Sequence, residues 1–231
     1  MKTDLARRSS NQNVGIFVIV GLIIVGATAF AAVPFSTPQP DGLTGITFAN
    51  SVTDADRMYL QTSLQLLQDN LPEWYDYVIQ TKPFALSVGN TTDSDWVAAE
   101  AVCCDERGNG FITFEDHFDR VATSDSSDQT TEANRIAFSS MLIHELTHLR
   151  DYRAGHMPAR MDAATCITSE GAAYAKEFEF KRAVVKTRFS DMRSGELYRQ
   201  AAEKQLVDDE EQFNTNFWKL YCILTHFNIG D

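Results

Sequence analysis

The sequence predicts an α+β fold that is predominantly helical, with a small antiparallel sheet and one apolar segment at the N-terminus. Three long stretches without proline, 132–153, 167–186 and 194–227, space their apolar residues as helices do. Two short apolar runs flank a turn-forming stretch, 105–110, and this arrangement predicts a β-hairpin. With 231 residues and 44% apolar content, the chain can bury the core of one domain.

The N-terminal segment divides the chain into four parts. Residues 1–13 carry basic side chains and are expected to stay in the cytoplasm. The apolar run 14–33 is long enough to cross a bilayer, which takes about 20 residues, so it is a transmembrane anchor or a signal peptide. Residues 34–45 are rich in Pro, Gly, Ser and Thr and read as a linker, and 46–231 form the folded domain.

Length favours a retained anchor for this run, because a signal-peptide core usually has about 7–15 apolar residues. Small residues around Ala29 and Ala31 resemble signal-peptidase sites, so cleavage stays open. Either way the domain is expected outside the cytoplasm, membrane-anchored or secreted. The net charge of −12 argues against nucleic acid as a partner, since phosphate binding relies on clustered Lys and Arg.

The first half of the domain contains short elements. Thr53 is a suitable N-cap for a helix that ends before Pro72, and a second helix is expected from Pro72 to Gln80. Strands are expected at 84–88, 96–104 and 111–114, with the last two paired as the hairpin. The two helices carry no chemistry of their own.

The central motif is His144-Glu145-Leu146-Thr147-His148, in a predicted helix with one buried side that Thr130 or Thr131 would cap and Gly155 would end. On a helix, His144 and His148 lie one turn apart on one face and can bind one metal ion. Zinc would lower the pKa of a bound water to about 7, and Glu145 is placed to take its proton. The alternative is an amphipathic helix whose two His satisfy buried polar groups.

A catalytic zinc site needs a third protein ligand, and this sequence offers several. Glu170 is preferred, because it precedes the small residues Gly171, Ala172 and Ala173, which let a second helix approach the first closely. The alternative role for Glu170 is a first-turn carboxylate that interacts with the helix dipole. The other candidates are His156, Asp151, Asp162 and Glu177.

Together these residues resemble the gluzincin metallopeptidases, over about Ile143 to Glu177. The resemblance implies a zincin-like domain, zinc on His144, His148 and Glu170, and Glu145 as general base. It also implies that a peptide substrate pairs with an edge strand, for which the residues are Phe111, Ile112, Thr113 and Phe114. Where many gluzincins have an acidic residue that supports a metal-binding His, this chain has Tyr174. Glu177 or Asp151 is expected to replace it. The candidates for stabilising the oxyanion are Tyr152, Tyr174, His156 and His226.

The function expected from these residues is an exported zinc-dependent metalloendopeptidase. It would hydrolyse peptide bonds by Glu145-assisted attack of zinc-bound water on a peptide or protein substrate. An alternative is a non-catalytic exported module that binds zinc or a partner with a degenerate peptidase fold. A further alternative, a coincidental motif in an anchored envelope protein, predicts no stoichiometric metal.

The four cysteines are expected to form disulfides in an exported domain. They are Cys103, Cys104, Cys166 and Cys222. A bond between the adjacent Cys103 and Cys104 is the least favoured of the three pairings. Either of the other two pairings would tie the hairpin to the loop before Glu170, because one of the adjacent cysteines would bond to Cys166. That bond would fix the substrate strand relative to the third ligand.

Overall fold

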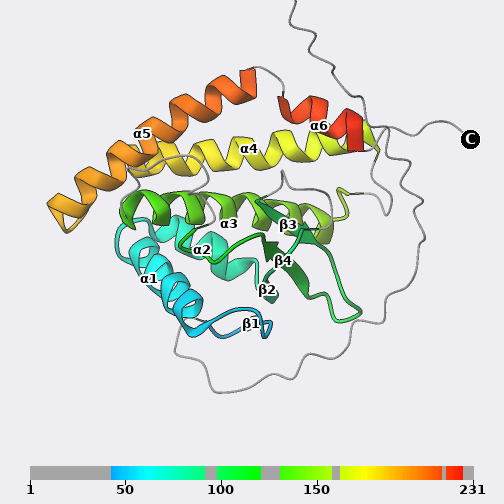
Figure 1. Cartoon of the computed structure of the whole chain (residues 1–231), viewed down its shortest axis with the longest axis horizontal. Helices are drawn as coiled ribbons and strands as arrows, with labels where there is room; N and C mark the ends of the chain where they lie inside the picture. Colours follow the sequence, from blue (N-terminus) through cyan, green and yellow to red (C-terminus); the bar gives the residue numbers. More distant parts are fainter. Residues whose placement is uncertain (1–42, 92–97, 121–130, 158–161, 215–216, 226–231) are drawn as a thin grey trace, which may run out of the picture. The chain divides into compact units, whose positions relative to one another are not determined.

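The computed structural model describes residues 43–91, 98–120, 131–157, 162–214 and 217–225, all within the unit Val33–Asp231. In this part of the chain, helices form most of the structure and a four-stranded sheet lies beside them (Figure 1). In chain order the elements are β1 (Ile46–Phe48), α1 (Asp54–Asn70), α2 (Pro72–Gln80), β2 (Phe84–Val88), β3 (Ala99–Val102), β4 (Gly110–Phe114), α3 (Thr131–Arg153), α4 (Ala163–Lys186), α5 (Met192–Asn214) and α6 (Phe217–Thr225).

The N-terminal helix pair agrees closely with the sequence prediction. Thr53 caps α1 in a capping box with Asp56, which satisfies two backbone N–H groups at the helix start. Pro72 occupies the first turn of α2, where its missing N–H costs nothing. Both helices therefore begin where the local sequence places them.

The sheet is mixed, so the prediction of an antiparallel sheet is wrong for two of its three strand pairings. Its order is β1-β2-β4-β3; β1, β2 and β4 run parallel and only β3 is antiparallel to its neighbour. The hairpin of β3 and β4 is confirmed. The sequence missed β1, which has only three residues, and α1 and α2 form the crossover from β1 to its parallel partner β2. Strand direction depends on such a crossover, which apolar alternation does not reveal.

Strand β4 lies inside the sheet, paired with β2 on one side and β3 on the other. Ile112 and Phe114 point into the core and are fully buried. Phe111 and Thr113 lie on the opposite face of the sheet and are half-buried. The expectation that Phe111 to Phe114 forms an edge strand for substrate is therefore wrong, because both backbone edges of β4 are already occupied. Among the described strands, the edge of the sheet next to β4 is formed by β3.

Helix α3 is the central element of the domain. In Figure 1 it lies between α4 on one side and α1, α2 and the sheet on the other. Every residue from Leu142 to Leu149 is buried, including the motif residues. The expectation of one buried side is thus corrected: α3 is enclosed on several sides, so polar groups enter the interior. At Gly110, an added Cβ would lie only 2.6 Å from the side chain of Leu149, which shows how closely β4 approaches the helix.

Helix α4 runs antiparallel to α3 (Figure 1) and begins earlier than predicted. Asp162 caps it by accepting a hydrogen bond from the Thr165 N–H at 2.8 Å. Glu170 therefore lies beyond the first turn. The dipole effect is confined to the terminal turn, so the dipole role weighed for Glu170 does not apply.

The C-terminal region forms two helices, α5 and α6, within the stretch predicted to contain one or two. The spacing of Phe213, Phe217, Leu220 and Leu224 predicts a buried stripe. This prediction is wrong in α6, where Leu220 and Leu224 are 50% and 72% exposed. Trp218 and Cys222 are buried instead. They lie on the face of α6 that packs against α4. Because α6 has apolar residues on both faces, the sequence did not indicate which face is buried.

The cysteines form the pairing that the sequence least favoured. Cys166 bonds to Cys222, with a Cα–Cα distance of 5.6 Å, and ties α4 to α6. Cys103 bonds to its neighbour Cys104 at the end of β3. The prediction that a bridge joins the hairpin to the region before Glu170 is therefore wrong.

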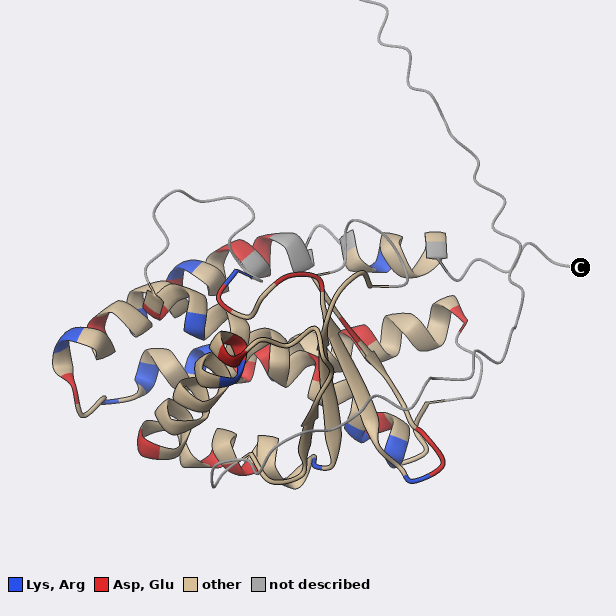
Figure 2. Cartoon of the chain, turned by 60° about the horizontal axis from the view of Figure 1, so that its bottom comes forward, with Lys and Arg blue, Asp and Glu red and all other residues tan. Residues whose placement is uncertain are grey.

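The predictions for residues 1–13, 14–33 and most of the 34–45 linker lie outside the described residues. Among the helices that are described, none combines the length and the apolar character needed to cross a bilayer. Leu43, assigned to the linker, is buried in the core. Figure 2 shows charged residues on the helices, on the β3–β4 turn and on other loops, and Glu100 is the one charged residue in the described strands.

Candidate metal centre

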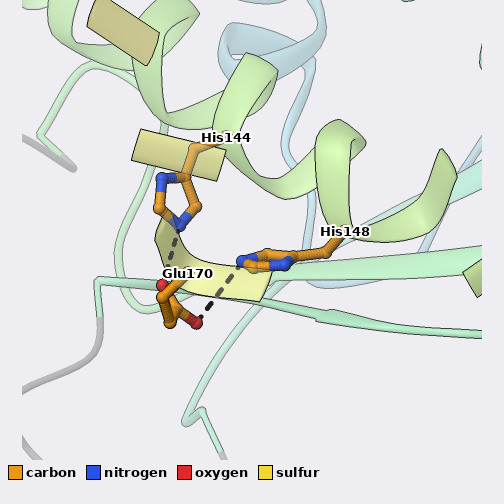
Figure 3. Close-up of side chains that lie close together, drawn as sticks. All are labelled: His144, His148 and Glu170. Carbon is orange, nitrogen blue, oxygen red and sulfur yellow. Dashed lines mark hydrogen bonds and ion pairs between the residues drawn. The ribbon is translucent and has the colours of Figure 1, made fainter. Parts of the chain in front are cut away.

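Three side chains from two helices converge at one point beside the sheet. His144 and His148 extend from adjacent turns of α3, and Glu170 extends toward them from α4 (Figure 3). Glu170 Oε2 lies 3.2 Å from His144 Nε2, and Glu170 Oε1 lies 3.4 Å from His148 Nε2. One potential ligand atom from each residue lies within 4.8 Å of the others. The sequence-predicted set thus assembles in three dimensions.

Each imidazole is oriented by a partner at its other nitrogen. His144 Nδ1 lies 3.1 Å from Glu177 Oε2, and His148 Nδ1 lies 2.8 Å from the Ser169 hydroxyl. Both rings therefore direct Nε2 toward Glu170. Metal-binding histidines commonly use such a partner to fix the ring and its tautomer. Glu177, one of two residues expected in this role, fills it for His144.

Glu177 is itself held by two groups that the sequence reasoning missed. The Ser140 hydroxyl donates to Glu177 Oε1 at 2.9 Å, and the ammonium group of Lys181 contacts the same oxygen at 2.9 Å. Lys181 is only 3% exposed, which is unusual for lysine. The available signal was spacing: Ser140 lies one turn before His144, and Lys181 lies one turn after Glu177.

Electrostatic coupling is strong across this cluster. Burial by itself would lower the pKa of His144, but hydrogen bonds with Glu170 and Glu177 raise it well above its ordinary value. Burial lowers the pKa of His148 to about 4. Although burial opposes ionisation of Glu177, Lys181 and His144 hold its pKa far below the ordinary value. The cluster thus contains ionised carboxylates inside the protein, compensated by the cations beside them.

Glu145 belongs to the same charged neighbourhood. It is 6% exposed, and burial raises its pKa to about 7, while the charge of His144 opposes this shift and that of Glu170 adds to it. A carboxyl group with a pKa near neutrality can accept a proton in one step and return it in the next. This pKa would suit the proton transfer that the sequence leads us to expect of Glu145.

The other candidates from the sequence occupy different places. Asp162 caps α4, and Asp151 lies 3.6 Å from the largely exposed His156 in a separate pair. The Tyr174 ring packs edge-on against His144, with ring centroids 4.7 Å apart. Tyr152 is close enough for its pKa, raised mainly by burial, to respond also to Glu100 and Glu170. His226 lies outside the described residues.

The donor set fits a divalent metal ion. Two imidazole nitrogens and one carboxylate oxygen from rigid helices are a known ligand set for zinc. The same donor types also suit other transition metals, so the residues define a metal site more firmly than they define the metal. Because both Nδ1 atoms have partners, the two Nε2 atoms and the Glu170 carboxylate are the groups aimed at the common point.

Comparisons with protein-family models, curated proteins and solved structures returned no match.

Proposed function

We propose that this protein is an exported zinc-dependent metallopeptidase of the gluzincin type. The observation that carries the proposal is the convergence of His144, His148 and Glu170, with both imidazoles oriented from behind. Glu145, next to the first histidine, is the residue that such a site needs for proton transfer and that a purely structural metal site does not. The disulfides are consistent with an exported domain.

In this proposal, each residue has a separate task. Zinc would supply a Lewis acid that favours ionisation of water and polarises the peptide carbonyl. Glu145 removes a proton from the attacking water and delivers it to the leaving amine. Glu177 and Ser169 keep the two imidazoles aimed at the centre, so that this geometry exists before the substrate binds.

Strand β3 is the element we assign to the peptide backbone of the substrate. It is an edge strand, it contacts α3, and it carries Glu100, whose charge influences Glu145. An extended peptide can add to such an edge through backbone hydrogen bonds. This assignment replaces Phe111 to Phe114, whose strand is internal.

The test combines metal analysis with hydrolysis. Purified full-length protein should contain about one zinc per chain and cleave unfolded casein. A chelator should stop cleavage and added zinc should restore it. Glu170→Ala should lose most of the metal, while Glu203→Ala, a change at an exposed position on α5, should retain it. Bound zinc without cleavage would favour the non-catalytic module, and absence of metal in the parent would refute the peptidase proposal and leave only a module that binds a partner without zinc.

A further inference from the structure

The metal-binding face of α3 continues one turn beyond the motif. His144, His148 and Tyr152 are spaced at intervals of four, so they form a stripe along one side of the helix. Tyr152 is half-buried and lies near enough to Glu170 and Glu100 for their charges to affect it. Tyr152 therefore lies one helical turn beyond His148 on the same side of α3.

Tyr152 forms part of a shallow pocket of about 390 Å³. The remaining lining residues are Cys103, Cys104, Gly108 and Arg153. Cys103 follows Val102, the last residue of β3, so the pocket lies where the exposed sheet edge ends. A peptide paired with β3 would thus meet the pocket at the end of that strand, and the pocket residue Tyr152 lies one turn of α3 beyond His148.

The lining has a consistent chemistry. Most of the lining is uncharged. The Cys103–Cys104 disulfide has no S–H group, Gly108 has no side chain, and Tyr152 contributes an aromatic ring. Arg153 supplies the one formal charge, but its guanidinium group donates to the carbonyls of Thr81, Pro83 and Gly108. It therefore braces the wall by joining α3 to the start of β2 and to the β3–β4 turn.

We propose that this pocket is a specificity subsite that binds an apolar or aromatic side chain of the substrate beside the bond to be cleaved. The inference rests on the proposed function, because it identifies the ligand as part of a peptide. Its physical basis is the removal of apolar surface from water between the ring of Tyr152 and the disulfide. Tyr152 and the Cys103–Cys104 pair are then determinants of specificity.

Two hydroxamates test this assignment without requiring turnover. Acetohydroxamate carries the metal-binding group alone, and 3-phenylpropanohydroxamate adds an aromatic ring on a short arm. On zinc-loaded full-length protein, calorimetry should show roughly tenfold tighter binding of the aromatic compound, as partial burial of a ring predicts. Tyr152→Ala and the double variant Cys103→Ser/Cys104→Ser should each reduce this ratio severalfold, and the double variant should bind acetohydroxamate as tightly as the parent. Tyr75→Ala, which removes an aromatic ring on α2, should leave the ratio unchanged.

The outcomes separate the subsite from the proposed function. If both compounds bind but the ratio is near one, or survives both pocket variants, the subsite assignment is overturned while the peptidase proposal stands. If the ratio behaves as expected but casein is not cleaved, the pocket is an apolar site beside a non-catalytic metal. If neither compound binds zinc-loaded protein, the metal centre and the subsite are both overturned.

Discussion

Asp56 and Glu170 each lie next to a histidine, and they differ in what surrounds them. Asp56 is 3% exposed and accepts hydrogen bonds from the backbone and hydroxyl of Thr53, from the Phe118 N–H and from His117. Glu170 contacts two imidazoles, and further carboxylates, those of Glu145 and Glu177, share its surroundings. At Asp56, hydrogen-bond donors surround a single carboxylate. At Glu170, further carboxylates and two imidazole nitrogens lie close together.

The difference shows how a structural charge can be distinguished from a functional one. Each oxygen of Asp56 has a donor, and its bonds join the start of α1 to the segment after β4. Such a group is satisfied without any ligand. At the candidate metal centre, the buried Glu145 and the partly buried Glu170 and Glu177 lie together on two helices, with His144 and Lys181 as the neighbouring cations. Local satisfaction therefore indicates structure, and converging ligand atoms indicate a binding site.

The largest expected effect is on catalysis. Glu145→Gln keeps the shape of the side chain but removes its ability to accept a proton, so casein hydrolysis should fall by about 10² to 10⁴. Zinc content should stay at the parental level, as measured by mass spectrometry of the native protein. Glu203→Gln on exposed α5 provides the control. Cleavage by Glu145→Gln at the parental rate would remove Glu145 from the mechanism.

A smaller effect, on zinc affinity, is expected from changing a residue that hydrogen-bonds to a candidate metal ligand. Glu177→Gln should weaken zinc affinity by roughly 10- to 100-fold, because His144 loses the carboxylate that orients it. This variant leaves Lys181 buried without its ion pair, which lowers stability as well. The double variant Glu177→Gln/Lys181→Met separates the two effects: stability should partly recover and affinity should stay low. Recovery of affinity in the double variant would show that Glu177 acts through folding alone.

Asp56→Ala should have the opposite profile. Losing the capping box and the bond to Phe118 should lower the free energy of unfolding by about 1–3 kcal/mol, as measured by urea denaturation of the metal-free protein. Zinc affinity should not change. A loss of zinc affinity comparable to that of Glu177→Gln would mean that the two clusters are coupled.

The smallest effect is the pH dependence of that stability difference. Burial opposes ionisation of Asp56, but its hydrogen bonds, those of Thr53 first, keep its folded-state pKa below 3.8. A lowered pKa means that the carboxylate stabilises the fold at pH values above 3.8 and that this contribution disappears as pH falls through the folded-state value. Parent and Asp56→Ala should therefore differ by a constant amount between about pH 5 and 7 and converge in stronger acid. Denaturation curves that diverge with acidification would contradict this sign.

Several features of the fold and the site follow from short-range patterns. The capping box at Thr53, the start of α2 at Pro72 and the pairing of β3 with β4 depend on neighbouring residues. The placement of His144 and His148 on one face follows from helical geometry alone. Glu170 could be selected because small residues after it permit close packing of a second helix.

The sequence by itself therefore determined the local elements, the two imidazoles on one face and the acid most suited to join them. Only the tertiary structure decided that β4 is internal, that Cys166 pairs with Cys222, and that Glu177 supports His144. These features depend on which segments meet in space, and apolar alternation or cysteine count is compatible with several arrangements. Helical periodicity acts over one turn, whereas sheet order and disulfide pairing are set by the packing of the whole core.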